Sequence, residues 1–187
     1  MKSYLRFIIC MLATTKVWAL SLYLPEHLEQ FRQTKSCLHC NLSGIRLRNQ
    51  VYKDVILSGS DLIKADLYNS SFEEANFSSA LLNGVSANTS SFLKANFDGA
   101  NLSYFSGKYT HFSGASFRDA KLDKARLISA NFSNADFTGA SLKDAILRRA
   151  IFIGANISEE QLRQAKTIEC AVLPDGTVYN SEHSKCS

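Results

Sequence analysis

The chain has 187 residues, 45% of them hydrophobic, which is enough for one domain with a sizeable core. Its 21 Lys and Arg against 17 Asp and Glu give a formal net charge of +4. Three of the cations lie in the first 19 residues, so the remainder carries 18 cations against 17 carboxylates and is nearly neutral. This balance does not support a global attraction to nucleic acid or to a membrane surface.

Residues 1–19 have the features of a secretory signal peptide. A positively charged start precedes an apolar run at residues 7–13, and Ala19 supplies a small residue at the cleavage position. A membrane anchor needs about 20 apolar residues, and Lys16 ends the run before that length. A lipoprotein signal is also a poor fit, because Cys10 lies inside the apolar run and not after it. We therefore expect export, with cleavage after Ala19.

Residues 20–39 are expected to form an N-terminal cap for the segment that follows. Proline suits the first position of a helix, and glutamates suit its positive end, so the sequence predicts an amphipathic helix from Pro25 to about Gln33. Phe31 lies on the apolar face of this helix. His27 is expected to face solvent.

Four cysteines follow the signal peptide, namely Cys37 and Cys40 before the central segment and Cys170 and Cys186 after it. An even number of cysteines in an exported chain favours disulfides. The alternatives for Cys37 and Cys40 are a redox motif and half of a zinc site. No βαβ context surrounds them, and no second ligand pair lies at metal-site spacing.

Residues 40–164 repeat every five residues. The central positions run from Leu42 to Leu162, and 21 of the 25 hold Leu or Phe. Alanine occupies 14 of the 25 positions that lie two residues before a centre. A helix has a period of 3.6 residues and a strand a period of 2, so a period of five fits neither. The pattern requires a coil whose turn is a multiple of five residues.

The identity of the central residue shows that this turn has 20 residues. Leucine recurs at every fourth centre from Leu42. Phenylalanine fills most positions of the two columns that begin at positions 52 and 57. Like residues therefore stack on like, as in a four-sided coil. One column is irregular because it includes Ala87 and Gly107, each preceded by a larger residue, Val85 or Phe105, that conserves the volume of the unit. We call the side built on its centres, at positions 47, 67, 87, 107, 127 and 147, the irregular wall.

Units such as Ala65-Asp66-Leu67, Ala95-Asn96-Phe97 and Ala135-Asp136-Phe137 match the pattern A-[DN]-[LF]-x-x. On these units the chain resembles the pentapeptide-repeat family, and the start of the repeat is similar to secreted bacterial members. The resemblance implies an all-β solenoid, a right-handed quadrilateral β-helix of about six 20-residue coils. We expect an N-terminal capping helix, a C-terminal helix and hairpin cap, and a bacterial protein in the periplasm or secreted.

Residues 165–187 are expected to form a disulfide-closed C-terminal cap. Just before them, Ser158 and Gln161 form a capping box that predicts a helix from Glu159 to about Lys166. Pro174-Asp175-Gly176 predicts a tight turn between two short strands. A rod of about 30 Å separates the two ends by more than a disulfide can reach. The predicted bridges are therefore Cys37–Cys40 and Cys170–Cys186.

No motif in the chain carries recognisable chemistry: the four histidines lie far apart, and no glycine-rich phosphate loop is present. We expect no enzymatic activity, no cofactor and no metal, so function must lie on the outer walls. The irregular wall is the most distinctive, with Tyr, Arg and Ile in proportions that resemble an interface. Ordinary surface variation is the alternative explanation. The candidate residues are Tyr68, Lys108, Tyr109, Arg126, Ile128, Ile146, Arg148 and Arg149.

We accordingly expect a non-enzymatic exported scaffold that binds a protein partner through an outer wall. One alternative is a structural or self-associating envelope protein. Another is a gyrase-binding DNA mimic, a role known for some relatives, which needs a strongly acidic rod in the cytoplasm. No nucleic acid is expected as a partner and no membrane span is expected in the mature chain. The expected state is a monomer or a weak homo-oligomer.

Overall fold

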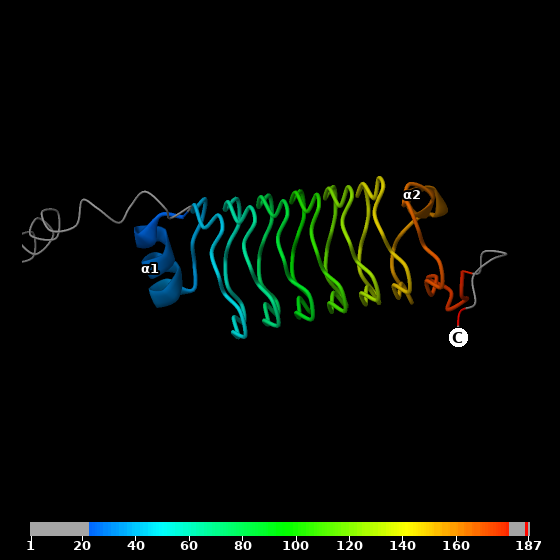
Figure 1. Cartoon of the computed structure of the whole chain (residues 1–187), viewed down its shortest axis with the longest axis horizontal. Helices are drawn as coiled ribbons and strands as arrows, with labels where there is room; N and C mark the ends of the chain where they lie inside the picture. Colours follow the sequence, from blue (N-terminus) through cyan, green and yellow to red (C-terminus); the bar gives the residue numbers. More distant parts are fainter. Residues whose placement is uncertain (1–22, 180–185, 187) are drawn as a thin grey trace, which may run out of the picture.

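The computed structural model of the chain is an elongated, four-sided coil with a helix near each end (Figure 1). It describes residues 23–179 and 186, so the predicted signal peptide at 1–19 lies outside the described residues. Helix α1 (Pro25–Thr34) precedes the coil and helix α2 (Glu159–Arg163) lies near its other end. Neither helix reaches the length and apolarity that crossing a bilayer requires, and the described residues contain no other helix.

The coil is held together by parallel bridges between residues one turn apart. From Ser36↔Ile56 to Asp136↔Asn156 every bridge joins residues 20 apart, which confirms the period predicted from the columns of central residues. The bridges are isolated, one to each five-residue unit, and the part of the chain that the structure describes contains no longer strand. The separation becomes 21 residues at Ile146↔Thr167, because the chain passes through α2 in this turn.

The interior is filled by the central residue of most units and by the residue two positions earlier, whereas Tyr52 and Ile157 are half-buried and Gln50 is exposed. Phe72, Phe92, Phe112, Phe132 and Phe152 stack in one column, with ring centroids 5.0–5.5 Å apart and planes within 10°. A second phenylalanine column beside it meets the first edge to face, at 62–71°. Both arrangements are favourable for aromatic rings, so the core gains ring–ring interactions in addition to area burial.

The Asp or Asn that precedes many centres satisfies a backbone group. Its side-chain oxygen accepts a hydrogen bond from the N–H two residues later, as when Asn76 Oδ1 accepts from Ser78 at 2.9 Å and Asp136 Oδ1 from Thr138 at 3.0 Å. Most other N–H groups of a unit bond to an adjacent turn or close the corner, as for Ala80 N–H to Phe77 O at 3.0 Å. The polar residue of the repeat is therefore a local Asx turn that completes the hydrogen bonding of the unit.

From Gly44 to Gly154 the last residue of each unit forms a corner in the left-handed region. Gly114 has φ +68°, and the glycines at the other corners also have positive φ. Asn69 adopts φ 52° at the same position, which asparagine tolerates. Thr89 adopts φ 60°, which costs a β-branched residue more because its Cβ is crowded there.

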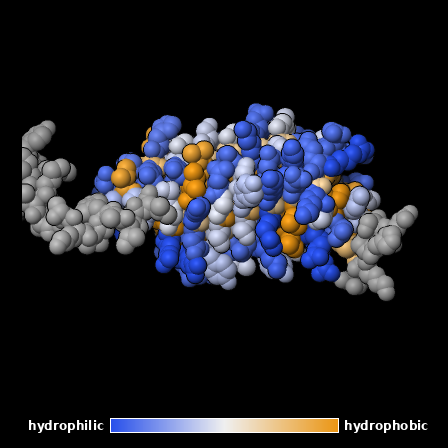
Figure 2. Space-filling model, turned by 45° about the horizontal axis from the view of Figure 1, so that its top comes forward, coloured by the Kyte–Doolittle hydropathy of each residue, from blue (hydrophilic) through white to orange (hydrophobic). Residues whose placement is uncertain are grey.

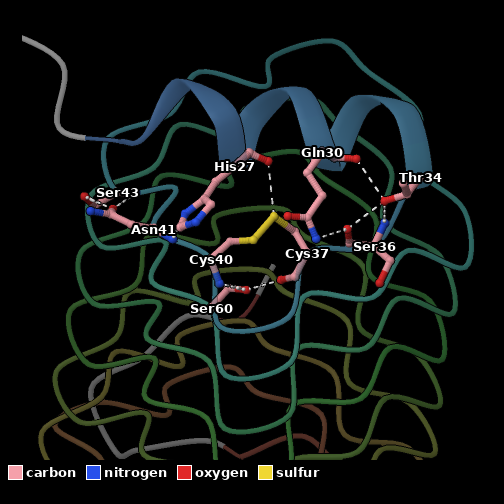
Figure 3. Close-up of a disulfide and its surroundings, with 9 residues drawn as sticks. All are labelled: His27, Gln30, Thr34, Ser36, Cys37, Cys40, Asn41, Ser43 and Ser60. Carbon is pink, nitrogen blue, oxygen red and sulfur yellow. Dashed lines mark hydrogen bonds between the residues drawn. A yellow bond between two sulfur atoms is a disulfide. The ribbon is translucent and has the colours of Figure 1, made fainter. Parts of the chain in front are cut away.

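The N-terminal end is organised by α1 and the first disulfide (Figure 3). Cys37 and Cys40 are joined, with their Cα atoms 5.4 Å apart, and the Cys37 sulfur lies 3.1 Å from the backbone oxygen of His27. His27 is half-buried, and its Nδ1 accepts a hydrogen bond from the backbone N–H of Asn41 at 2.8 Å. The prediction that His27 faces solvent was therefore wrong: it ties the helix to the first turn of the coil. Phe31 is buried and packs against Tyr52, with ring centroids 5.1 Å apart.

The C-terminal end contains the predicted capping box, and Leu162, the last centre of the repeat, is buried. Helix α2 ends at Arg163, whereas the sequence predicts a helix to about Lys166. It is shorter because Lys166 donates its backbone N–H to Ala145 O at 2.8 Å and so returns to the coil. Val172 and Val178 form the antiparallel bridge of the predicted hairpin, and Cys170 is bonded to Cys186.

Acid should destabilise the fold through two carboxylates of the repeat. Partial burial acts to raise the pKa of Asp66, but hydrogen bonds from Arg48 and from the N–H of Tyr68 outweigh it and the pKa is lowered. The Thr138 hydroxyl and N–H lower the pKa of Asp136 against partial burial. Since both folded pKa values lie below the unfolded value of about 3.9, their stabilisation is complete above that pH and is lost as the pH falls through the folded values.

We expect the melting temperature of the wild-type protein to fall between about pH 5 and pH 2. The variant Asp136→Asn should show a smaller fall, because its amide still accepts from the Thr138 N–H but does not titrate. Thermal melts followed by circular dichroism across this range would measure both. Parallel pH profiles for the two proteins would contradict the assignment to Asp136.

Candidate functional site

The register of the coil places the predicted residues of the irregular wall on one face. Successive bridges align Arg126 with Ile146, and both continue a column that begins at Arg46. Backbone hydrogen bonds align a second column through the residues after the centres: Tyr68, Asn88, Lys108, Ile128 and Arg148. Tyr109 and Arg149 lie in the corner column next to it. All eight candidates therefore belong to the same side of the rod.

Within this wall, Tyr68 lies apart from the other seven residues. It is two turns before Lys108, or about 10 Å along the axis, with Asn88 between them. The Arg48 guanidinium lies 6.0 Å from the centre of the Tyr68 ring and pairs with Asp66 at 2.5 Å. Tyr68 thus belongs to a separate, internally paired group. The other seven candidates form a continuous patch, which we call the basic patch.

The four cations of the basic patch are exposed and make no ion pair within residues 23–179. They are Lys108, Arg126, Arg148 and Arg149. The Lys108 Nζ lies 5.2 Å from the centre of the Tyr109 ring, and residue Tyr109 is 54% exposed. Ile128 and Ile146 are half-buried between them. The patch therefore combines free positive charge with aromatic and aliphatic surface.

Charged residues are distributed unevenly among the four walls, which was not predicted from the sequence. Between residues 46 and 149 the units of the irregular wall carry six cations and one carboxylate. The other three walls together carry seven cations and nine carboxylates between residues 40 and 157. A nearly neutral chain thus has one strongly positive side. Summing the charges column by column, with the same period of 20 that ordered the core, is the signal that reveals it. Arg46 and Arg48 are the two cations of this wall that the candidate set omitted.

Pentapeptide repeats match the chain in eight copies, over residues 40–78, 70–103, 108–134 and 130–166. The chain belongs to the pentapeptide repeat family. Members of this family form right-handed quadrilateral β-helices, which gives the hand of the coil, and they are generally structural or binding proteins. No curated protein matches the chain.

The chain is similar in structure to several solved pentapeptide repeat proteins, at low sequence identity. QnrB1, a plasmid-mediated fluoroquinolone resistance protein, is 16% identical, with a TM-score of 0.49 over 75% of this chain and 82% of its own. HetL of Nostoc sp. strain PCC 7120, involved in heterocyst differentiation regulation, is 23% identical, with a TM-score of 0.24 over 85% and 100%. Rfr23 of Cyanothece 51142 is 20% identical, with a TM-score of 0.29 over 83% and 98%.

Other surfaces of this pentapeptide repeat protein offer less. One view of the rod shows hydrophobic side chains scattered among hydrophilic ones without a single large patch (Figure 2). A hollow of about 580 Å³ lies beside α2, where Arg163 and Lys166 are balanced by Glu159 and Glu169. Among the described residues no group of three or more His, Cys, Asp or Glu side chains could hold a metal ion. The basic patch therefore remains the best-defined candidate for binding.

Proposed function

We propose that this pentapeptide repeat protein is a non-enzymatic, exported scaffold that binds a protein partner through the basic patch. The observation that carries the proposal is the stacking of four unpaired cations, an exposed tyrosine and two isoleucines on one wall, while the other walls together have an excess of carboxylates. Arginine and tyrosine contribute strongly to protein interfaces, since each combines apolar area with directional polar contacts.

Export is supported by two independent features. Residues 1–19 have the composition of a signal peptide, and removal of this segment leaves an even number of cysteines. The structure joins Cys37 with Cys40 and Cys170 with Cys186, and disulfides persist in oxidising compartments. A periplasmic or extracellular location is consistent with both features.

The ends of the rod are proposed to be closed by the segments around the helices. At one end Phe31 of α1 is buried against Tyr52 and continues a column of aromatic rings. At the other, the backbone oxygens of Thr167 and Val172 accept hydrogen bonds from the N–H groups of Leu147 and Phe152. These contacts occupy groups that would otherwise offer an open edge to another chain. We therefore assign residues 20–39 and 165–187 as caps of a repeat domain at 40–164, which leaves the side walls for binding.

The test is cross-linking in the native host, with the cross-linked partner identified and then quantified for variants. Arg148→Glu combined with Tyr109→Ala should reduce the yield of cross-linked partner at least tenfold, because the patch exchanges an exposed cation for a carboxylate and loses its aromatic ring. The matched control is Lys143→Glu with Tyr104→Ala, which makes the same chemical changes on another wall. Equal yields from the two double variants would rule out the basic patch as the binding surface.

A further inference from the structure

The repeat shows how this fold binds a carboxylate on its own outer surface. Wherever Asp or Asn precedes a centre and caps the N–H two residues later, the oxygen lies 2.8–3.3 Å from that nitrogen. A second arrangement reaches the same N–H from the previous turn, as when Asn88 Oδ1 accepts from Lys108 N–H at 2.8 Å. In both cases a planar oxygen acceptor occupies one defined position on the wall.

In the basic patch this position is not filled at two adjacent turns. Arg126 and Ile146 stand where the capping Asp or Asn would be, and Lys108 and Ile128 stand where the cap from the previous turn would be. Neither Ile128 nor Arg148 has an acceptor for its backbone N–H among the residues that the structure describes. These two donors lie one turn apart, about 4.8 Å along the rod.

The charges around these donors distinguish them from similar ones. Uncapped N–H groups also occur on other walls, for example at Glu73, so such donors by themselves do not identify a binding site. At Ile128 and Arg148 they lie among four cations without an ion pair in the described part of the chain. Hydrogen bonds to a charged acceptor are roughly twice as strong as neutral ones, and the guanidinium groups can bind carboxylates through two parallel bonds.

We propose that the basic patch binds an extended, Asp- and Glu-rich segment of the partner protein, whose carboxylates take the place of the missing caps at Ile128 and Arg148. This inference rests on the proposed function and specifies the chemistry of the partner. Arg126, Arg148 and Arg149 pair with the bound carboxylates. The isoleucines and Tyr109 contact the aliphatic parts of the segment. This apolar surface, together with a donor position that the fold fills with Asp and Asn oxygens, favours a peptide over a phosphate or sulfate polymer.

The experiment uses the mature protein and a short fluorescein-labelled peptide of alternating Asp and Thr, with binding followed by fluorescence anisotropy. Ile146→Asn should place an internal cap on Arg148 N–H without changing the charge, and so weaken binding about tenfold relative to Ile146→Ala. Arg126→Asn should likewise bind about tenfold more weakly than Arg126→Gln, which has the same charge but a side chain too long for the cap. Each Asn variant should melt a few degrees above its control, since its N–H is satisfied.

Asn variants that bind the peptide as tightly as their controls would overturn the inference. It would also be overturned if a heparin fragment or duplex DNA of equal charge bound more tightly, with an affinity that Ile146→Asn leaves unchanged. Failure of the proposed function gives a different result. In that case the cross-linked partner survives Arg148→Glu with Tyr109→Ala. If cross-linking of the partner depends on the patch but excess acidic peptide does not displace it, the proposed function stands. Only the proposal that the partner segment is acidic is then overturned.

Discussion

Phe105→Ala and Gly107→Leu should each destabilise the protein strongly, and the double variant should recover most of the loss. Phe105 is fully buried and reaches across the interior into the space that a normal centre would occupy at position 107. Removing its ring leaves a cavity, at a cost of about 3–5 kcal/mol. A side chain at position 107 would instead collide with Phe105, because even its Cβ would lie 2.9 Å from the ring.

The double variant restores the arrangement that the next turn already has, where Ala125 precedes the buried Leu127. Gly107→Leu alone should cost about 1–3 kcal/mol from overpacking, whereas a volume-conserving exchange usually costs less than about 1.5 kcal/mol. The coupling energy between the two positions should therefore exceed about 2 kcal/mol. Equilibrium denaturation of the four proteins in the cycle would measure it.

A matched control replaces a phenylalanine that does not contact position 107. Phe137 lies in another column, where it stacks on Phe117 and meets the edges of Phe132 and Phe152. Phe137→Ala combined with Gly107→Leu should show additive losses. Additive losses for the Phe105 pair as well would mean that the interior does not exchange volume between the two positions.

The second large effect is expected at the middle of the phenylalanine column. Phe112 stacks on Phe92 and Phe132 at 5.3 and 5.0 Å and meets the edge of Phe117. Phe112→Ala should lower the free energy of unfolding by about 3–5 kcal/mol. Because each turn contacts only its neighbours, the cavity should also weaken the coupling between the two halves of the rod.

Weaker coupling should broaden the denaturant transition of Phe112→Ala, with a smaller slope than that of the wild type. Phe152→Ala is the control, since Phe152 stacks in the column on one side only, against Phe132. The transition of Phe152→Ala should shift to a lower denaturant concentration, and its slope should stay closer to that of the wild type. Equal slopes for Phe112→Ala and the wild type would show that the rod unfolds as one unit despite the cavity.

Much of this fold follows from the sequence because the pattern and the packing have the same period. The columns of Leu and Phe predict the bridges 20 residues apart, and Phe105 beside Gly107 predicts the exchange of volume in the core. The capping box at Ser158 also forms as predicted. Each of these features depends on residues near in sequence or one period apart, so a one-dimensional pattern contains the information.

The remaining features depend on contacts that the period does not encode. His27 is held by a hydrogen bond from Asn41, outside its own helix. Helix α2 ends early because Lys166 returns to the coil at Ala145. The unpaired state of the Arg126 and Arg148 side chains depends on which neighbours lie within reach. The candidate wall could therefore be chosen from composition, and its charge from a column-by-column sum, while its unpaired side chains and unfilled donors required the register in three dimensions.

The bridges between residues 20 apart also constrain how the length of this rod can change. A duplication or deletion of 20 residues within the repeat would add or remove one turn, about 4.8 Å, and leave every downstream side chain on its original face. A change of five residues would instead rotate everything downstream by a quarter turn and move Arg126 and Arg148 away from the face that carries Arg46. Only insertions and deletions of whole turns therefore keep the basic side continuous. The length of the rod can change in steps of 20 residues without changing the face on which each side chain lies.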